Sequence, residues 1–208
     1  MRVAHVLLLG LGWLAAIHSS GAAAAGEPAA GSGGRAPFTG LYAGPEAGGH
    51  EHHFYLEVTD PGTGETRERY YRGWGLGGGA FIGRDFALSP RLRAGIEAGI
   101  SLGGNNPVAR FSDGTDYTQH PRYGLRITGK AGYLLSERLI AYGTLGYGGH
   151  RYRLAGSAIV GNAQEWGSSF TIGAGLEYRA TDRVGIRLDF RHLDNQMSHL
   201  LVGLPVRF

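Results

Sequence analysis

The sequence predicts an all-β protein, an eight-stranded antiparallel up-and-down transmembrane β-barrel that follows an N-terminal signal peptide. Three observations support this fold class. Apolar and polar side chains alternate with a period close to two from residue 38 onward, which is typical of strands rather than helices. Turn-type residues divide this region into eight segments, most of them near the length of a tilted membrane-spanning strand, about 9–11 residues. The last segment ends in an aromatic residue, Phe208.

The N-terminus has the three-part layout of a secretory signal peptide. Arg2 supplies a positive charge, an apolar run covers residues 6–17, and small residues fill 19–25. The apolar run is too short to cross a bilayer as a helix, which takes about 20 residues, and this argues against a membrane anchor. The predicted domains are a signal peptide at 1–25, a flexible periplasmic linker at 26–37 and the barrel at 38–208.

Composition restricts the chemistry that the chain can perform. The absence of cysteine excludes a lipid-modified N-terminal cysteine, disulfides and thiolate catalysis. A formal net charge of only +3 gives no argument for nucleic acid, despite the sequence pI of about 9.3. A mean hydropathy of −0.15 would be odd for a helical membrane protein but is ordinary for a barrel, in which only alternate residues meet lipid.

Within each predicted strand, the alternation defines two faces. In the segment 90–103, Ile96 belongs to an apolar face and Glu97 to a polar one. The apolar face carries no charge in strands three to eight, and Arg84 in strand two lies near a strand end, where it can reach the interface. Phe38 has the wrong parity for the first strand as drawn. The predicted strands are 38–48, 73–86, 90–103, 123–135, 138–148, 166–179, 183–191 and 199–208.

Aromatic side chains gather near both ends of the apolar face, as the two interfaces of a bilayer select. A soluble ligand-binding barrel inverts the alternation and would need aromatic residues through the depth of its interior, so the two rims favour a membrane barrel. One predicted rim carries Phe86, Tyr133, Tyr178 and Phe208, and the other carries Trp74, Tyr123, Tyr147, Trp166 and Phe190.

The predicted connections alternate between short and long. Short periplasmic turns and long extracellular loops are the known asymmetry of outer-membrane barrels, and an even number of strands then places both mature termini in the periplasm. The short connections lie near 87–89, 136–137 and 180–182, and the long ones at 49–72, 104–122, 149–165 and 192–198.

Residues 38–208 resemble the eight-stranded OmpA/OmpX and opacity-type surface protein families. The segment 38–44 resembles their first strand, and 199–208 resembles their last. The resemblance implies the outer membrane of a Gram-negative bacterium, contact with outer-membrane lipids and lipopolysaccharide, and recognition of the C-terminal strand by the barrel-assembly machinery. It says little about activity. We predict no cofactor and no nucleic-acid partner, and an extracellular partner could bind through the loops.

Nine charged residues are predicted to line the barrel interior. An eight-stranded barrel is just wide enough for side chains to fill it, and an unpaired buried charge costs about 3–5 kcal/mol. We therefore expect these charges to pair, with Glu97–Arg126 and Glu177–Lys130 as candidates. The set forms a structural ion-pair plug or, if the pairs exchange partners, a narrow gated pore. The nine are Glu46, Arg93, Glu97, Arg126, Lys130, Glu177, Arg187, Asp189 and Arg207.

Seven histidines follow the signal peptide, and all map to predicted loops or outer strand ends. In the first long connection, His50, His52 and His53 could bind a transition metal through imidazoles or respond to pH. Their spacing repeats no known metal-site pattern, so we favour solvated loop histidines. The seven are His50, His52, His53, His120, His150, His192 and His199.

An enzyme is a further possibility. Residues 191–195 are similar to the His-x-Ser-Asn stretch of small outer-membrane barrels that deacylate lipid A. Asp194 stands at the position of the nucleophile, and a carboxylate lacks the hydroxyl that acyl transfer needs. Ser198 and His199 are adjacent, but neighbours along a strand point to opposite faces. The sequence therefore predicts no enzyme.

The predicted role is instead a structural envelope protein or a surface adhesin or antigen. The segment 50–72 mixes aromatic and charged residues. It could bind a partner, or it could form a solvated hairpin that extends the first two strands, as is common in this architecture.

Overall fold

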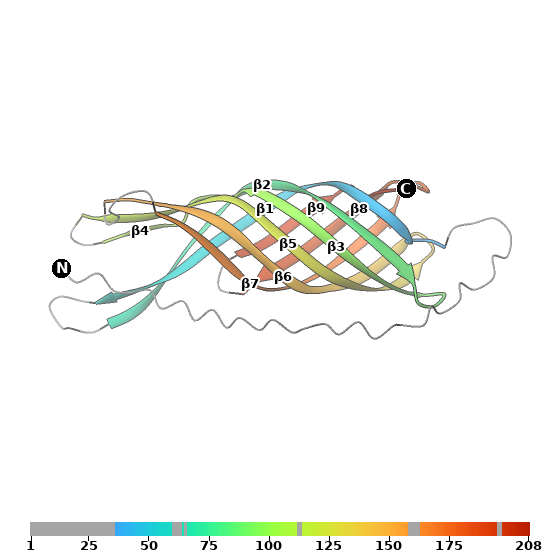
Figure 1. Ribbon diagram of the computed structural model, residues 1–208, viewed down its shortest axis with the longest axis horizontal. Coiled ribbons are helices and arrows are strands. Elements are labelled where there is room, and N and C mark those ends of the chain that lie inside the picture. Colours follow the sequence, from blue (N-terminus) through green and yellow to red (C-terminus); the bar gives the residue numbers. More distant parts are fainter. Residues whose placement is uncertain (1–35, 60–63, 65, 112–113, 158–162, 195–196) are drawn as a thin grey trace. The chain divides into compact units, whose positions relative to one another are not determined.

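The computed structural model describes residues 36–59, 64, 66–111, 114–157, 163–194 and 197–208 (Figure 1). The predicted signal peptide and most of the predicted linker lie outside the described residues. Within the described part, no helix is long and apolar enough to span a membrane.

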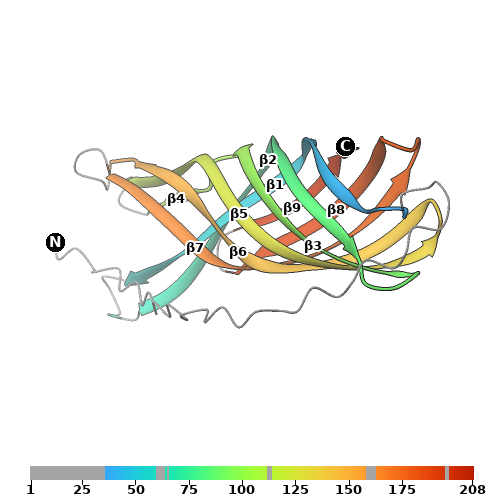
Figure 2. The same ribbon diagram turned by 45° about the vertical axis from the view of Figure 1, so that its right-hand side comes forward.

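The described residues form a single sheet that closes into a barrel (Figures 1 and 2). Each strand pairs antiparallel with its neighbours, and β1 closes the ring by pairing with β2 on one side and with β9 and β10 on the other. The strands are β1 (Gly40–Thr59), β2 (Thr66–Ala87), β3 (Leu92–Gly103), β4 (Val108–Arg110), β5 (Asp116–Ser136), β6 (Leu139–Ala155), β7 (Ala163–Arg179), β8 (Gly185–Leu193), β9 (Met197–Gly203) and β10 (Val206–Arg207).

The predicted count of eight strands around the ring is confirmed. β9 and β10 together form the eighth strand, which is interrupted at Pro205, a residue that has no N–H to donate to a ladder. β4 is an additional short strand that pairs with β5 outside the ring.

The strands are longer at one end than predicted. β1 and β2 stay paired as far as Thr59 and Thr66, so most of the predicted loop at 49–72 is a strand hairpin. The loops predicted at 104–122 and 149–165 likewise contain β4 and extensions of β5, β6 and β7. These extensions project together at the end remote from the C-terminus (Figures 1 and 2). They were missed because both faces become rich in polar and charged side chains there, while pairing still satisfies the backbone.

At the opposite end, the first strand begins two residues later than predicted. Phe38 precedes β1 with a φ of 56°, and its ring is buried against Leu134, Ile140 and Tyr142. This explains why Phe38 did not fit the parity of the strand: its side chain is part of a small apolar cluster that covers the inside of the barrel end.

The residues of the predicted outward face are exposed. All nine residues of the proposed rims are exposed, from 38% for Trp166 to 65% for Phe208. At the same time, the other face is buried, as in β3, where Arg93 and Glu97 point inward. Apolar residues outside and charged residues inside are the reverse of a water-soluble barrel.

Candidate functional site

The interior holds six charged groups that join four strands of the ring, β1, β3, β5 and β8, and we call them the central ion network. Glu46 of β1 lies 3.0 Å from Arg187 of β8 and 3.1 Å from Arg126 of β5. Glu97 of β3 lies 2.6 Å from Arg187. The guanidinium of Arg187 also lies over the ring of Phe81 of β2, 3.5 Å from its centroid. The network consists of Glu46, Glu97, Asp189, Arg126, Arg187 and Arg191.

A second ion network is also buried in the interior. Lys130 lies 2.7 Å from Asp85, and Arg207 pairs with both Glu177 and Asp85. The hydroxyl of Tyr42 connects the two networks, because it donates to Glu97 at 3.0 Å and accepts from Lys130 at 3.2 Å. In each network the number of cations equals the number of carboxylates, so the networks are neutral in charge.

The nine predicted lumen residues all point into the barrel, but their pairing differs in part. Glu97–Arg126 is confirmed, at 2.8 Å. The predicted pair Glu177–Lys130 is wrong, because Glu177 pairs with Arg207 and Lys130 pairs with Asp85. Arg93 contacts carbonyl oxygens instead of a carboxylate, with Nε donating to Pro37 at 2.8 Å.

Two members of the networks were missed. Asp85 and Arg191 are buried at 2% and 3% exposure, and both have the inward parity of their strands. Both lie within the strands as drawn from the sequence, 73–86 and 183–191, close to one end, and they were left out of the list of interior charges. Strict parity within the predicted bounds includes both.

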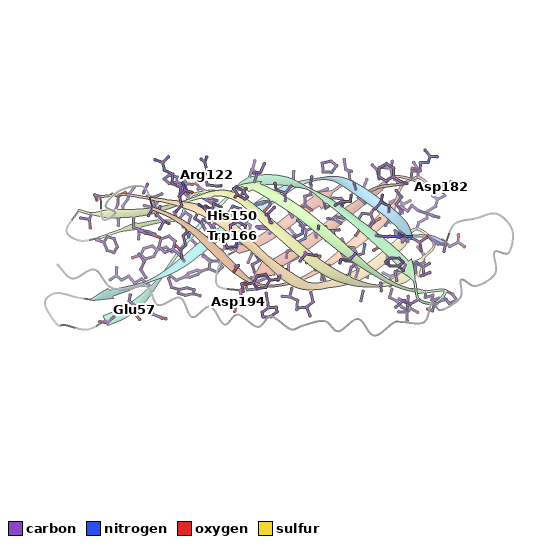
Figure 3. All side chains as sticks on the ribbon, in the orientation of Figure 1. Glu57, Arg122, His150, Trp166, Asp182 and Asp194 are labelled. Carbon is purple, nitrogen blue, oxygen red and sulfur yellow. The ribbon has the colours of Figure 1, made fainter. Side chains whose placement is uncertain are left out.

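Five of the seven histidines are buried and not solvated, which corrects the prediction for them, while His120 and His192 are partly exposed. His50, His52, His150 and His199 are at most 4% exposed and point into the barrel. His53 is also buried, at 6%, but on the other face of β1, where its ring packs 5.1 Å from that of Tyr70. The three residues of the proposed loop motif therefore do not share one site. Figure 3 labels His150 in the half of the barrel remote from Asp182, and the outer parts of the strands continue beyond it.

A serine–histidine pair, missed in the sequence, lies on the outer face of β8 and β9. His192 and Ser198 are directly opposed, with 3.0 Å between Nδ1 and Oγ. Ser198 and His199 do point to opposite faces, as predicted. The cross-strand partner was overlooked because only chain neighbours were considered.

Hydrogen bonds also tie the outer extensions together. The backbone N–H and hydroxyl of Ser157 donate to the carboxylate of Asp116, at 3.0 and 2.9 Å. These bonds favour the ionised carboxyl, so they hold the pKa of Asp116 below its usual value. The beginning of β5 and the end of β6 are thereby linked beyond the barrel.

Fold and interior together define an eight-stranded membrane barrel whose core is filled by paired charges. The chain matches the family model described as "Outer membrane protein beta-barrel domain" over residues 12–200. It belongs to this family, and its place is the outer membrane of a Gram-negative bacterium. Among curated proteins, none matches this chain in sequence.

Solved structures with a similar arrangement include three outer-membrane proteins. Ail of Yersinia pestis, solved with the heparin analogue sucrose octasulfate, is 16% identical over 81% of this chain and 99% of its own, with a TM-score of 0.45. Neisserial surface protein A is 15% identical over 82% of this chain and 98% of its own, also with a TM-score of 0.45. The N-terminal barrel of Pseudomonas aeruginosa OprF is 14% identical over 80% of this chain and 97% of its own, with a TM-score of 0.39.

Proposed function

We propose that this chain is a non-catalytic integral outer-membrane protein, a structural envelope component that also acts as a surface adhesin or antigen. The central ion network carries the proposal, because its salt bridges join opposite walls of the barrel and leave its charges paired. An interior that is filled by side chains and cross-linked by salt bridges supports a structural role. In this proposal both mature termini are periplasmic, lipids and lipopolysaccharide surround the outer face, and the assembly machinery reads the C-terminal strand.

The alternative function is a gated pore. A conductance measurement distinguishes it most directly from the proposed structural role. We expect the purified barrel to show no ion conductance in a planar lipid bilayer, because Glu46 and Glu97 are each held by guanidinium groups from more than one strand. A reproducible conductance that changes when Glu46 is replaced by Gln would favour the pore. Protein inserted in vesicles and checked by its gel mobility before and after heating serves as the control for folding.

The surface role depends on the hairpin formed by the outer parts of β1 and β2. Tyr55 and Tyr70 are 49% and 44% exposed, with ring centroids 5.0 Å apart. The hydroxyl of Tyr70 donates to Glu51 at 3.2 Å, which fixes the ring. Exposed, ordered tyrosines are typical of recognition surfaces.

We expect the double change Tyr55→Ser and Tyr70→Ser to reduce adhesion to host cells or self-association several-fold, since it removes both exposed rings. Val108→Ser is the matched control, because Val108 is a 40% exposed apolar residue on a different outer strand, β4. Adhesion of bacteria that display each variant at equal surface level is the measurement. Equal loss in the control and the double variant would rule out a specific role of the hairpin.

The bond between His192 and Ser198 favours a second candidate, an acyl hydrolase. A serine within hydrogen-bond reach of an imidazole is the arrangement of an activated nucleophile. However, a third group should orient the base, and within the described residues no carboxylate hydrogen-bonds to His192. We therefore expect lipid A mass spectra to be identical for cells with the native chain and with Ser198→Ala. An acyl chain lost only with the native chain would establish the hydrolase instead.

A further inference from the structure

Four buried histidines meet inside the barrel, and we call them the histidine cluster. They come from three strands: His50 and His52 from β1, His150 from β6 and His199 from β9. The rings of His50 and His199 are stacked with centroids 4.1 Å apart, and those of His52 and His150 lie 4.8 Å apart. The ring of His52 also lies 6.3 Å from both members of the stacked pair.

Most ring nitrogens of the cluster are free to accept a new partner. Both nitrogens of His50 and of His150, and Nε2 of His199, are buried without a hydrogen-bond partner among the described residues. A buried polar atom left unpaired is destabilising. Five such atoms in one place therefore call for a ligand that imidazole nitrogens can bind.

His52 differs, because both of its nitrogens are engaged. Its Nε2 lies 3.2 Å from the carbonyl oxygen of Gly103 and must donate there, so in the neutral ring Nδ1 accepts from the hydroxyl of Tyr152 at 3.1 Å. The ring is thus fixed in one tautomer and orientation with no free lone pair, so the nitrogens open to a metal ion are those of His50, His150 and His199.

The barrel wall makes room for these rings. A Cβ at Gly77 would come within 2.6 Å of the ring of His50, and one at Gly124 within 2.5 Å of the ring of His150. Both clashes would be closer than real side chains allow, so the small residues opposite the rings are required by the cluster.

Binding of a single ion requires the rings of the cluster to move. Two imidazoles bound to one zinc ion at the usual Zn–N distance of about 2.0–2.1 Å have centroids about 5 Å apart. The free rings of His50 and His199 are 4.1 Å apart, closer than this value, while the separations of 4.8 and 6.3 Å involve His52, whose nitrogens are engaged. Among the described residues no three ligands already converge on one point, so rotation of the rings has to accompany binding.

The charge around the cluster is compatible with a cation. Arg191 is the cross-strand neighbour of His199, and alone it would repel a metal ion. Its guanidinium is however paired with Glu46 at 2.9 Å and with Asp189 at 3.3 Å, so its charge is balanced.

We infer that the histidine cluster is a binding site for one divalent transition-metal ion of the zinc class. Neutral imidazole is a preferred ligand of zinc, copper and nickel. The inference does not depend on the surface role proposed above, because the cluster is inside the barrel and the hairpin tyrosines are outside.

The test is calorimetric titration of zinc chloride into the folded barrel in detergent, prepared without a polyhistidine tag. We expect saturable binding of one zinc ion per chain, weakened more than about tenfold in His150→Gln and in His199→Gln, each of which removes a ligand. His53→Gln and His120→Gln are the matched controls and should bind as the native chain does. Gel mobility before and after heating shows that each variant is folded.

A second measurement uses cobalt(II) as the probe and needs no variant. Coordination by several imidazoles should give visible absorption bands that zinc abolishes. The inference is overturned if the native chain shows no saturable zinc binding, or if His150→Gln and His199→Gln bind as tightly as the native chain. It is also overturned if His53→Gln alone abolishes binding, since that would place the metal on the outer face of β1.

Discussion

Replacing Arg187 by methionine is expected to lower the free energy of unfolding by about 3–5 kcal/mol. Arg187 is 1% exposed and pairs with Glu46, Glu97 and Asp189. Methionine fills similar space but provides no positive charge, so buried carboxylates lose a partner that they cannot replace with bulk water. Arg187→Lys should also destabilise the barrel, because an ammonium group cannot bridge two carboxylates as the planar guanidinium does.

Equilibrium unfolding in urea, with the barrel folded in lipid vesicles, measures this effect. Arg84→Met is the matched control: Arg84 is an exposed arginine on β2 whose guanidinium lies over Phe86 on the outer face. It should change the stability far less. The double variant Arg187→Met with Glu97→Gln should recover part of the loss. If Arg187→Met alone is within about 0.5 kcal/mol of the native chain, the central ion network is not the stabilising element that we infer.

The same network shows what could be predicted from the sequence. Side-chain parity identifies which charges face inward, because a strand alternates strictly between two faces. Parity alone was sufficient to place Glu46 and Glu97 in the interior. Parity carries no information on which inward residues meet across the barrel, since that depends on the tilt and stagger of strands far apart in the chain. Lys130 therefore pairs with Asp85 and not with the predicted Glu177.

The histidine cluster shows a second limit of prediction from the sequence. The sequence pattern stops resembling a membrane strand near His50, where lipid no longer selects apolar residues on the outer face. The ladder nevertheless continues, since β1 and β2 remain paired for nine more residues beyond this point. Histidines assigned to a loop are thus buried in a strand, and His150 and His199 become their neighbours only when the ring closes.

Replacing Ile127 by arginine is expected to destabilise the barrel by about 2–4 kcal/mol. Ile127 is 53% exposed and lies on the outward face of β5 between Tyr123 and Tyr133, which mark the two predicted rims. In a bilayer this position is near the centre of the hydrocarbon, where a guanidinium loses its hydration and is too far from either interface to reach it without strain.

Val108→Arg separates the effect of lipid from the effect of the substitution itself. Val108 is similarly exposed, but it lies on β4, which pairs with β5 at Thr118, beyond Tyr123. Arginine there should cost about 0–1 kcal/mol, since the side chain meets water or the interface. Urea titration of both variants in vesicles measures the difference. Equal stability of Ile127→Arg and Val108→Arg would mean that the outward face between the rims does not contact hydrocarbon, because an exposed arginine on a barrel in water has no desolvation cost at either position.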